Sequence, residues 1–469
     1  MFGIVLDRDS SQSLALQLTN ALRGAIRAGT LSPGKRLPAT RVMAEELSVS
    51  RNIVVTAYEQ LVSEGYLESR VGRGTTVAPG TAWTMPRAHP VPSVVGMSRN
   101  VKYSLIPGVP DLAAVPVRRW MECASDAHRN ASPEAWTYPE AQGERELRRE
   151  ICGYLFRIRG ITVPPERVLV TAGTAEALRL LSSFFRGRGY SRFAVENPSI
   201  HYARDIARIA GLAVHELDQD GTAALPPDRV EPGSLVYLTP SHQFPRGGLM
   251  PAPRRMAFLQ AVGDGDGFVL EDDYDSEFRF RGVPPEPMVE LDPDRVVYMG
   301  SFSKVLSPAL RLGFIVVPEA LVTPLVEHRR RVISAPPVFP QRALARFLGR
   351  GYLEKHLFAM KRTYARRAAR ILEFLDREFP NAEVRGDACG YHLWVRFSGV
   401  SSAGAVRPAF DADFFEACAD RGLAVKGEGH YTFDESVDTD ALVLGYGNIG
   451  DDRLDDALAL LAELVSRRV

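Results

Sequence analysis

From about residue 104 onward, short apolar runs alternate with segments of helical periodicity. The runs are VLVTAG (168–173), RFAVENP (192–198), SLVYLTP (234–240), GFVLEDDY (267–274) and VVYMGSFSK (296–304). Strands that are apolar on both sides and joined by helices predict a mostly parallel α/β sheet buried on both faces. Functional loops are then expected at the carboxyl ends of the strands. From about residue 350, a long basic helix leads into an α+β portion.

The first 78 residues have a different pattern. Apolar residues recur at spacings of three and four between Leu14 and Ile26, which predicts a helix ending near Gly29. A second helix is expected over about 39–47 and a third from near Ser50. The segment LESRVGRGTTVA (67–78) then reads as a hairpin. Three helices and a hairpin predict a winged helix-turn-helix.

Residues 79–100 separate these two patterns. The segment contains four prolines and lacks helical or strand periodicity, which favours a semi-extended linker over a surface loop within one domain. The predicted division is a DNA-binding domain over 1–78, a linker over 79–100 and a large domain over 101–469.

The charge balance does not by itself indicate a nucleic-acid partner. The chain has 57 basic and 57 acidic residues, so any DNA binding has to come from a local patch. Residues 1–78 hold nine basic and seven acidic residues, a local excess of +2.

The cysteines and the N-terminal segment indicate where in the cell the protein is expected. The four cysteines, Cys123, Cys152, Cys389 and Cys418, form no CxxC pair, which argues against a disulfide framework and a zinc site of the usual spacing. We therefore expect no metal. The N-terminus lacks the pattern of a signal peptide, and no run of about 18 apolar residues predicts a membrane span. The expected location is the cytoplasm.

The segment from Leu31 to Val77 closely resembles the winged helix of the GntR family of regulators. A basic face exposed to solvent would explain any single arginine here, but the whole set favours binding to double-stranded DNA. Ser50 is expected to cap the third helix, whose first amides suit a phosphate. The resemblance and the chemistry together predict DNA contacts from Lys35, Arg36, Arg41, Ser50, Arg51, Asn52 and Arg73.

In the large domain, the segment GSFSKVLSPALRLGF (300–314) carries a candidate catalytic lysine. Lys304 follows an apolar strand, and a lysine buried there can lose its proton and form a Schiff base with an aldehyde. The hydroxyls of Ser301 and Ser303 and the charge of Arg311 suit a phosphate dianion. A lysine in a polar loop is the alternative for this motif taken alone.

Other strand ends add groups that pyridoxal phosphate needs. Asp272 and Tyr274 follow the strand GFVL and would serve the pyridinium nitrogen and the phenolic oxygen. Small residues after the strand VLVT open a helix whose amides suit a phosphate. Those residues are Gly173, Thr174 and Ala175, and the strand end at TPSHQFPRG supplies His242 and Gln243.

Together, TPSHQFPRG, EDDYDSEF and GSFSK resemble the MocR/GabR subfamily, which joins a GntR-type DNA-binding domain to a fold-type I aminotransferase domain. The resemblance implies pyridoxal 5′-phosphate held by Lys304 as a Schiff base. It assigns Asp272 to the pyridine nitrogen, Tyr274 to the phenolic oxygen, and Thr174 and the 301–311 segment to the phosphate. It also implies a head-to-tail homodimer.

Two positions depart from the family pattern. In ENPSIHYA, the position that usually carries a ring to stack on the pyridine aligns with Ile200, with His201 beside it. An aliphatic contact replaces stacking, or the alignment is off by one. Near the C-terminus, Val443 stands where the family usually has an arginine that grips an amino-acid carboxylate. A valine cannot do this.

The preferred hypothesis is a regulator that senses pyridoxal phosphate or an amino compound, and Val443 favours the cofactor itself as effector. Vitamin B6 or amino-compound metabolism would then be the regulated process. The alternatives are an aminotransferase with an accessory DNA-binding domain and a DNA-binding protein whose large domain only dimerises. Physiological turnover is not expected, because a transaminase must bind two carboxylate substrates in turn, although half-reactions are chemically possible.

Overall fold

The computed structural model describes residues 2, 4–70, 74–80, 101–227, 229–332, 335–397, 399–401, 404–406, 410–434 and 439–468. The chain divides into two compact units, Met1–Met97 and Ser98–Val469. Residues 81–100 lie outside the described residues, so the linker remains a prediction. None of the helices in the described part of the chain combines the length and apolar character needed to span a bilayer.

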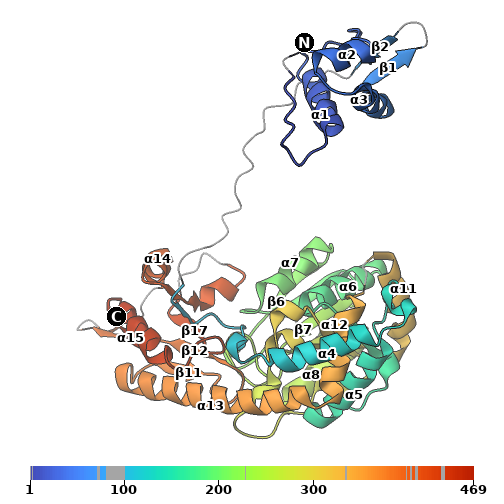
Figure 1. The fold of residues 1–469 in the computed structure, drawn as a ribbon. Helices are drawn as coiled ribbons and strands as arrows, with labels where there is room; N and C mark the ends of the chain where they lie inside the picture. Colours follow the sequence, from blue (N-terminus) through green and yellow to red (C-terminus); the bar gives the residue numbers. More distant parts are fainter. Residues whose placement is uncertain are drawn as a thin grey trace. The chain divides into compact units, whose positions relative to one another are not determined.

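The described residues of the N-terminal unit form three helices and a two-stranded antiparallel sheet (Figure 1). These elements are α1 (Leu14–Arg27), α2 (Thr40–Glu46), α3 (Arg51–Ser63), β1 (Leu67–Arg70) and β2 (Gly74–Val77). Leu18, Leu22 and Ile26 of α1 are fully buried, as their spacing predicts, and pack in one small core with α3. The predicted helices and hairpin strands are therefore present.

The second unit is built on a seven-stranded sheet of order β4-β10-β9-β8-β7-β5-β6. Its strands are β4 (Val168–Thr171), β5 (Arg192–Glu196), β6 (Ala213–Leu217), β7 (Ser234–Leu238), β8 (Phe268–Asp273), β9 (Val296–Ser301) and β10 (Gly313–Val316). Every pairing is parallel except those of β10 with β4 and β9. The predicted mostly parallel sheet is confirmed.

Side-chain alternation along the strands gives this sheet two buried faces. In β7, Leu235 and Tyr237 join one core and Val236 and Leu238 join the other. Helices cover both faces (Figure 1). The helices of this part of the chain are α4 (Val117–Arg129), α5 (Arg145–Arg159), α6 (Thr174–Gly187), α7 (His201–Ile209), α8 (Ala252–Asp264), α9 (Met288–Leu291), α10 (Phe302–Val305), α11 (Glu319–Val332) and α12 (Val338–Gly349).

The C-terminal portion begins with the long helix α13 (Tyr352–Glu378), where a basic helix was expected. It packs with an antiparallel sheet of order β11-β12-β17-β16, formed by β11 (Glu383–Arg385), β12 (His392–Arg396), β17 (Ala441–Gly445) and β16 (Lys426–Gly427). The remaining elements are β3 (Tyr103–Ser104), β13 (Gly399–Ser401), β14 (Gly404–Val406), α14 (Ala412–Asp420), β15 (Leu423–Ala424) and α15 (Leu454–Ser466). Here an α+β subdomain faces the strand ends of the main sheet.

Candidate functional site

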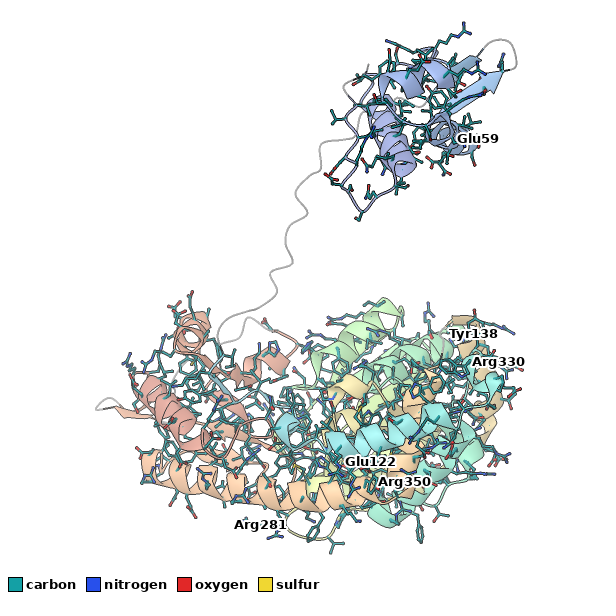
Figure 2. All side chains as sticks on the ribbon, viewed as in Figure 1. Glu59, Glu122, Tyr138, Arg281, Arg330 and Arg350 are labelled. Atoms are coloured by element: carbon teal, nitrogen blue, oxygen red, sulfur yellow. The ribbon has the colours of Figure 1, made fainter. Side chains whose placement is uncertain are left out.

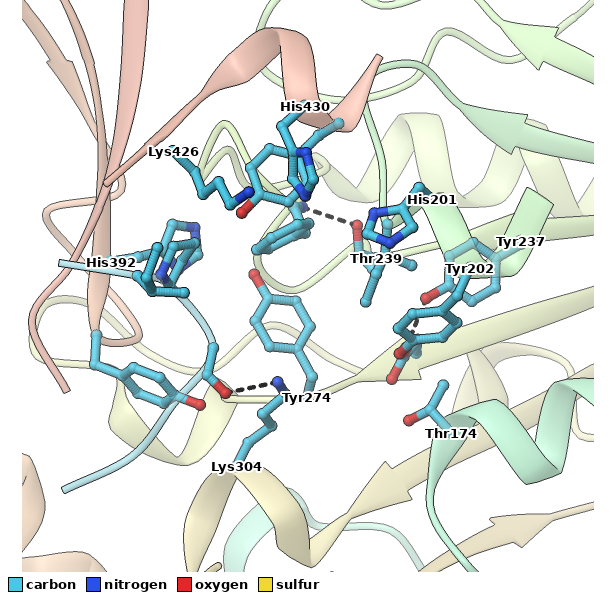
Figure 3. Close-up of a pocket in the computed structure, with 18 residues that line it drawn as sticks. Thr174, His201, Tyr202, Tyr237, Thr239, Tyr274, Lys304, His392, Lys426 and His430 are labelled. Atoms are coloured by element: carbon cyan, nitrogen blue, oxygen red, sulfur yellow. Dashed lines mark hydrogen bonds between the residues drawn. The ribbon is translucent and has the colours of Figure 1, made fainter. Parts of the chain in front are cut away.

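A pocket lies where the carboxyl ends of the main-sheet strands meet the C-terminal subdomain (Figure 3). The main sheet and its loops contribute Thr174, Ile200, His201, Tyr202, Tyr237, Thr239, Phe244, Asp272, Tyr274 and Lys304. The rest of the lining is Ile106, Pro107, Gly108, Tyr391, His392, Lys426, His430 and Tyr431. The fold thus gathers residues from across the second unit around one cavity.

Lys304 occupies the short helix α10, directly after β9, and its Nζ donates a hydrogen bond to the Gly108 carbonyl at 2.7 Å. Burial lowers the pKa of the Lys304 ammonium, and the carboxylates of Asp272 and Asp275 oppose that shift. A lowered pKa increases the fraction of neutral amine, which is the form that condenses with an aldehyde.

Asp272, near the end of β8, offers a carboxylate oxygen to the pocket. The Tyr237 hydroxyl donates to its Oδ2 at 2.6 Å. Its Oδ1 is buried and has no hydrogen-bond partner among the described residues. Burial raises the pKa of Asp272 to about 7. Since an unpaired buried acceptor is costly, this oxygen suits a ligand N–H such as a pyridinium.

Tyr274 points into the same pocket and is held from behind by His242. The Tyr274 hydroxyl lies 3.1 Å from His242 Nδ1, which lies 2.9 Å from Asp275 Oδ1. Burial lowers the pKa of His242 to about 3, so its imidazole is neutral. His242 does not line the pocket, although the sequence placed it among the cofactor contacts. Its geometry is that of a group that positions Tyr274.

His242, Asp275 and Cys389 also bring three possible metal-ligand atoms within 4.8 Å of one another, all buried. The imidazole is already hydrogen-bonded to the Asp275 carboxylate. That contact accounts for the approach of His242 and Asp275, and we assign the pair to positioning Tyr274.

Gln243, the other predicted contact on this loop, is also buried behind the wall of the pocket. Its Nε2 donates to the Pro198 carbonyl at 3.0 Å. Thr239 and Phe244, on either side, line the pocket instead. The sequence pattern located this loop but not the side chains that face the cavity.

The predicted phosphate residues gather at one end of the pocket. Gly173 has a φ of +98°, and a Cβ on it would lie 3.8 Å from Ser303 Oγ and 3.9 Å from Ser301 Oγ. Thr174 lines the pocket and begins the 14-residue helix α6, so its amide and that of Ala175 belong to the first helical turn, which has no intrahelical acceptors. Such amides, beside two hydroxyls, suit a phosphate.

Arg311 is exposed, and its guanidinium makes no hydrogen bond or ion pair with another described residue. Its backbone is left-handed, with a φ of 49°. Burial raises the pKa of the Tyr202 hydroxyl, and the Arg311 guanidinium partly opposes that shift. Because Tyr202 lines the pocket, Arg311 carries its charge close to that cavity.

Ile200 and His201, the two positions considered for ring stacking, both line the pocket. Ile200 precedes α7, and His201 packs against His430 with ring centroids 5.2 Å apart. The sequence analysis missed Tyr202, one residue further along α7, which presents an aromatic ring to the same cavity (Figure 3). The motif ENPSIHYA therefore supplies a ring two positions after the expected one.

Val443 is fully buried in β17 and does not line the pocket. It packs with Trp394, Tyr431 and Phe244. Since Tyr431 and Phe244 both line the cavity, Val443 supports this wall from behind.

The predicted DNA-contacting side chains lie on the surface of the N-terminal unit. Exposed positions include Lys35, Arg36, Arg41, Ser50, Arg51 and Asn52, whereas Arg73 lies outside the described residues. Ser50 is the N-cap residue of α3, but its side chain makes no capping hydrogen bond, contrary to expectation. The Arg51 Nε donates to Thr40 Oγ1 at 3.4 Å, which ties the start of α3 to α2.

Comparisons with protein families match both units. Residues 14–77 match the model of bacterial regulatory proteins of the gntR family, and residues 107–437 match aminotransferase class I and II. The HTH-type pyridoxine biosynthesis transcriptional regulator PdxR of Corynebacterium glutamicum is 32% identical over 466 residues, covering 99% of this chain and 98% of that protein. This chain belongs to the MocR/GabR subfamily of GntR-type transcriptional regulators.

This chain is also similar to a second regulator and to an aminotransferase of known structure. The probable rhizopine catabolism regulatory protein MocR of Rhizobium meliloti is 38% identical, covering 84% of each chain. The structure of LysN, an α-aminoadipate aminotransferase from Thermus thermophilus complexed with N-(5′-phosphopyridoxyl)-L-leucine, has 26% identity and a TM-score of 0.65, covering 78% of this chain and 92% of that one. The second unit is thus a fold-type I aminotransferase domain, and its cofactor is pyridoxal 5′-phosphate.

Proposed function

We propose that this regulator holds pyridoxal phosphate on Lys304 and that its DNA binding depends on what occupies the pocket. The observation that carries the proposal is the unpaired buried Oδ1 of Asp272 in the same cavity as the Lys304 amine. When bound, the cofactor supplies an aldehyde that condenses with amines and a ring that withdraws electrons. Asp272 would hold the ring nitrogen, and Tyr274 would donate toward the phenolic oxygen.

The phosphate end is proposed to rest on the amides of Thr174 and Ala175, the two serine hydroxyls near Gly173, and Arg311. This arrangement would place the cofactor ring near Tyr202 and Ile200. The exposed basic residues around α2 and α3 would contact double-stranded operator DNA.

We also propose a head-to-tail homodimer in the cytoplasm. Trp136 and Tyr138 are 67% and 93% exposed, so both aromatic rings lie largely in water. Tyr138 lines a surface hollow with Arg330, and Figure 2 labels both residues. Burial of this surface by a second copy would remove the rings from water and provide two DNA-binding units for two half-sites. The four cysteines are free thiols, which supports a reducing compartment.

The experiment is a titration of labelled DNA from upstream of the gene, using apo-protein with and without pyridoxal phosphate. A change in affinity or footprint caused by the cofactor alone would make the cofactor the effector. Equal binding in both states would direct the search to an amine. If no DNA binds at low or moderate salt, the regulatory proposal fails and an aminotransferase role has to be tested.

A further inference from the structure

Lys426 lies beside the position that lacks the expected arginine. In the antiparallel pairing of β16 with β17, Lys426 is the direct partner of Val443, and Val443 is the direct partner of Trp394 on β12. Directly paired residues place their side chains on the same face of a sheet. The ammonium of Lys426 therefore extends from the face on which an arginine at position 443 would stand.

The Lys426 ammonium is not neutralised within the described part of the chain. It is half-buried and makes no ion pair or hydrogen bond with another described residue. The nearest carboxylate in the sequence, Glu428, is paired with Arg246 at 2.6 Å. Figure 3 shows the Lys426 side chain directed toward the middle of the pocket. A half-buried cation without a partner is suited to bind an anion.

Lysine is a rare residue in this chain, and two of its lysines lie in this pocket. Only six of its 57 basic residues are lysines, and two of these, Lys304 and Lys426, line the same pocket. Thr174, at the proposed phosphate end, lies on the opposite side of the view from Lys426 (Figure 3). A cofactor phosphate at Thr174 would leave the Lys426 ammonium for another anionic group.

We propose that Lys426 binds the anionic group of the effector, so that the effector is an amine that also carries a carboxylate. This inference rests on the proposed function, because it assumes that the amine end is directed to the cofactor on Lys304. An ammonium is a compact charge without the planar fork of a guanidinium. The site therefore selects for negative charge and tolerates more than one spacing between amine and carboxylate.

The test compares carboxylated amines with amines of matched length that lack the carboxylate. The cofactor-loaded protein is titrated with β-alanine and 4-aminobutyrate, and with ethylamine and propylamine, while the cofactor absorption is recorded. Lys426→Met should weaken binding of the amino acids by about 10- to 100-fold and leave the amines unchanged. Lys426→Arg should retain most of the affinity. Lys361→Met, which removes an exposed lysine of α13 outside the pocket, is the matched control.

A second readout does not require the cofactor chemistry. Calorimetry with butyrate, which has no amine, should give weak binding to the unmodified protein and none to Lys426→Met. The inference is overturned if Lys426→Met weakens the binding of amino acids and amines equally, or weakens the binding of neither. It is also overturned if the wild-type protein binds no carboxylated probe. Failure of the proposed function would give a different result, because the purified protein would then show no absorption band from bound cofactor before any probe is added.

Discussion

The two units of this regulator place their functional residues in opposite environments. In the N-terminal unit, the described residues predicted to contact DNA are all exposed to solvent, on the surface around one small core. In the second unit, Asp272 and Tyr274 are held in the interior, where burial raises the pKa of both. An exposed cation keeps its charge and can contact a phosphate without rearrangement. The pKa of a buried acid or base is instead set by burial and by the groups around it. Four experiments test this difference.

The largest effect is expected at the buried lysine. Lys304→Ala should abolish covalent retention of pyridoxal phosphate, since the other pocket lysine extends from a different wall. The fold should persist, because the only hydrogen bond of the Lys304 side chain to another described residue is the one to the Gly108 carbonyl. Borohydride reduction followed by mass spectrometry measures this. A cofactor adduct on another residue would refute the assignment.

The second largest effect is expected in the core of the DNA-binding unit. Leu22 is fully buried there, so Leu22→Ala should destabilise this unit by about 2–5 kcal/mol and reduce DNA binding. Cofactor absorption should not change, because the two units have separate cores. Differential scanning calorimetry checks this, with Val5→Ala as the control because Val5 is 90% exposed. Loss of the cofactor spectrum as well would show that the units do not fold independently.

Asp272→Asn should weaken cofactor binding by about 10- to 100-fold, because the charged partner of the pyridinium is lost. It should also alter the pH dependence of the apo-protein. The pKa of Asp272 is raised from 3.8 to about 7, so its contribution to stability is fully present below pH 3.8 and lost as pH rises through 7.

The free energy of unfolding of the apo-protein should therefore fall between about pH 4 and pH 7, and less steeply in Asp272→Asn. Asp275→Asn is the matched control, because burial also raises its pKa to about 7 but its side chain contacts His242 rather than lining the pocket. It should flatten the profile with a smaller loss of cofactor affinity. Equal cofactor losses in the two variants would contradict the role of Asp272.

The smallest effect is expected at the exposed surface. Arg51→Ala should reduce DNA affinity by about tenfold and lower the slope of log K against log salt by about 1 if the contact is to a phosphate. Arg27→Ala removes the same charge near Tyr66, beyond the far end of α3. It should have little effect. Unchanged binding by Arg51→Ala at several salt concentrations would remove Arg51 from the interface.

The sequence by itself determined the classes of structure and the main chemical groups. Alternating apolar runs gave the parallel sheet, and spacings of three and four gave α1, because these patterns follow from backbone geometry. Lys304, Asp272 and Tyr274 were found because short motifs place them directly after strands, and strand ends converge in this fold.

Tertiary structure decided which neighbours of those motifs face the cavity. His242 and Gln243 turn behind the wall while Phe244 lines it, and Tyr202 lines the cavity together with Ile200. Lys426 reaches the pocket only through its pairing with β17. A loop's direction and a strand's pairing partner depend on contacts between residues far apart in the chain, and no local pattern encodes them.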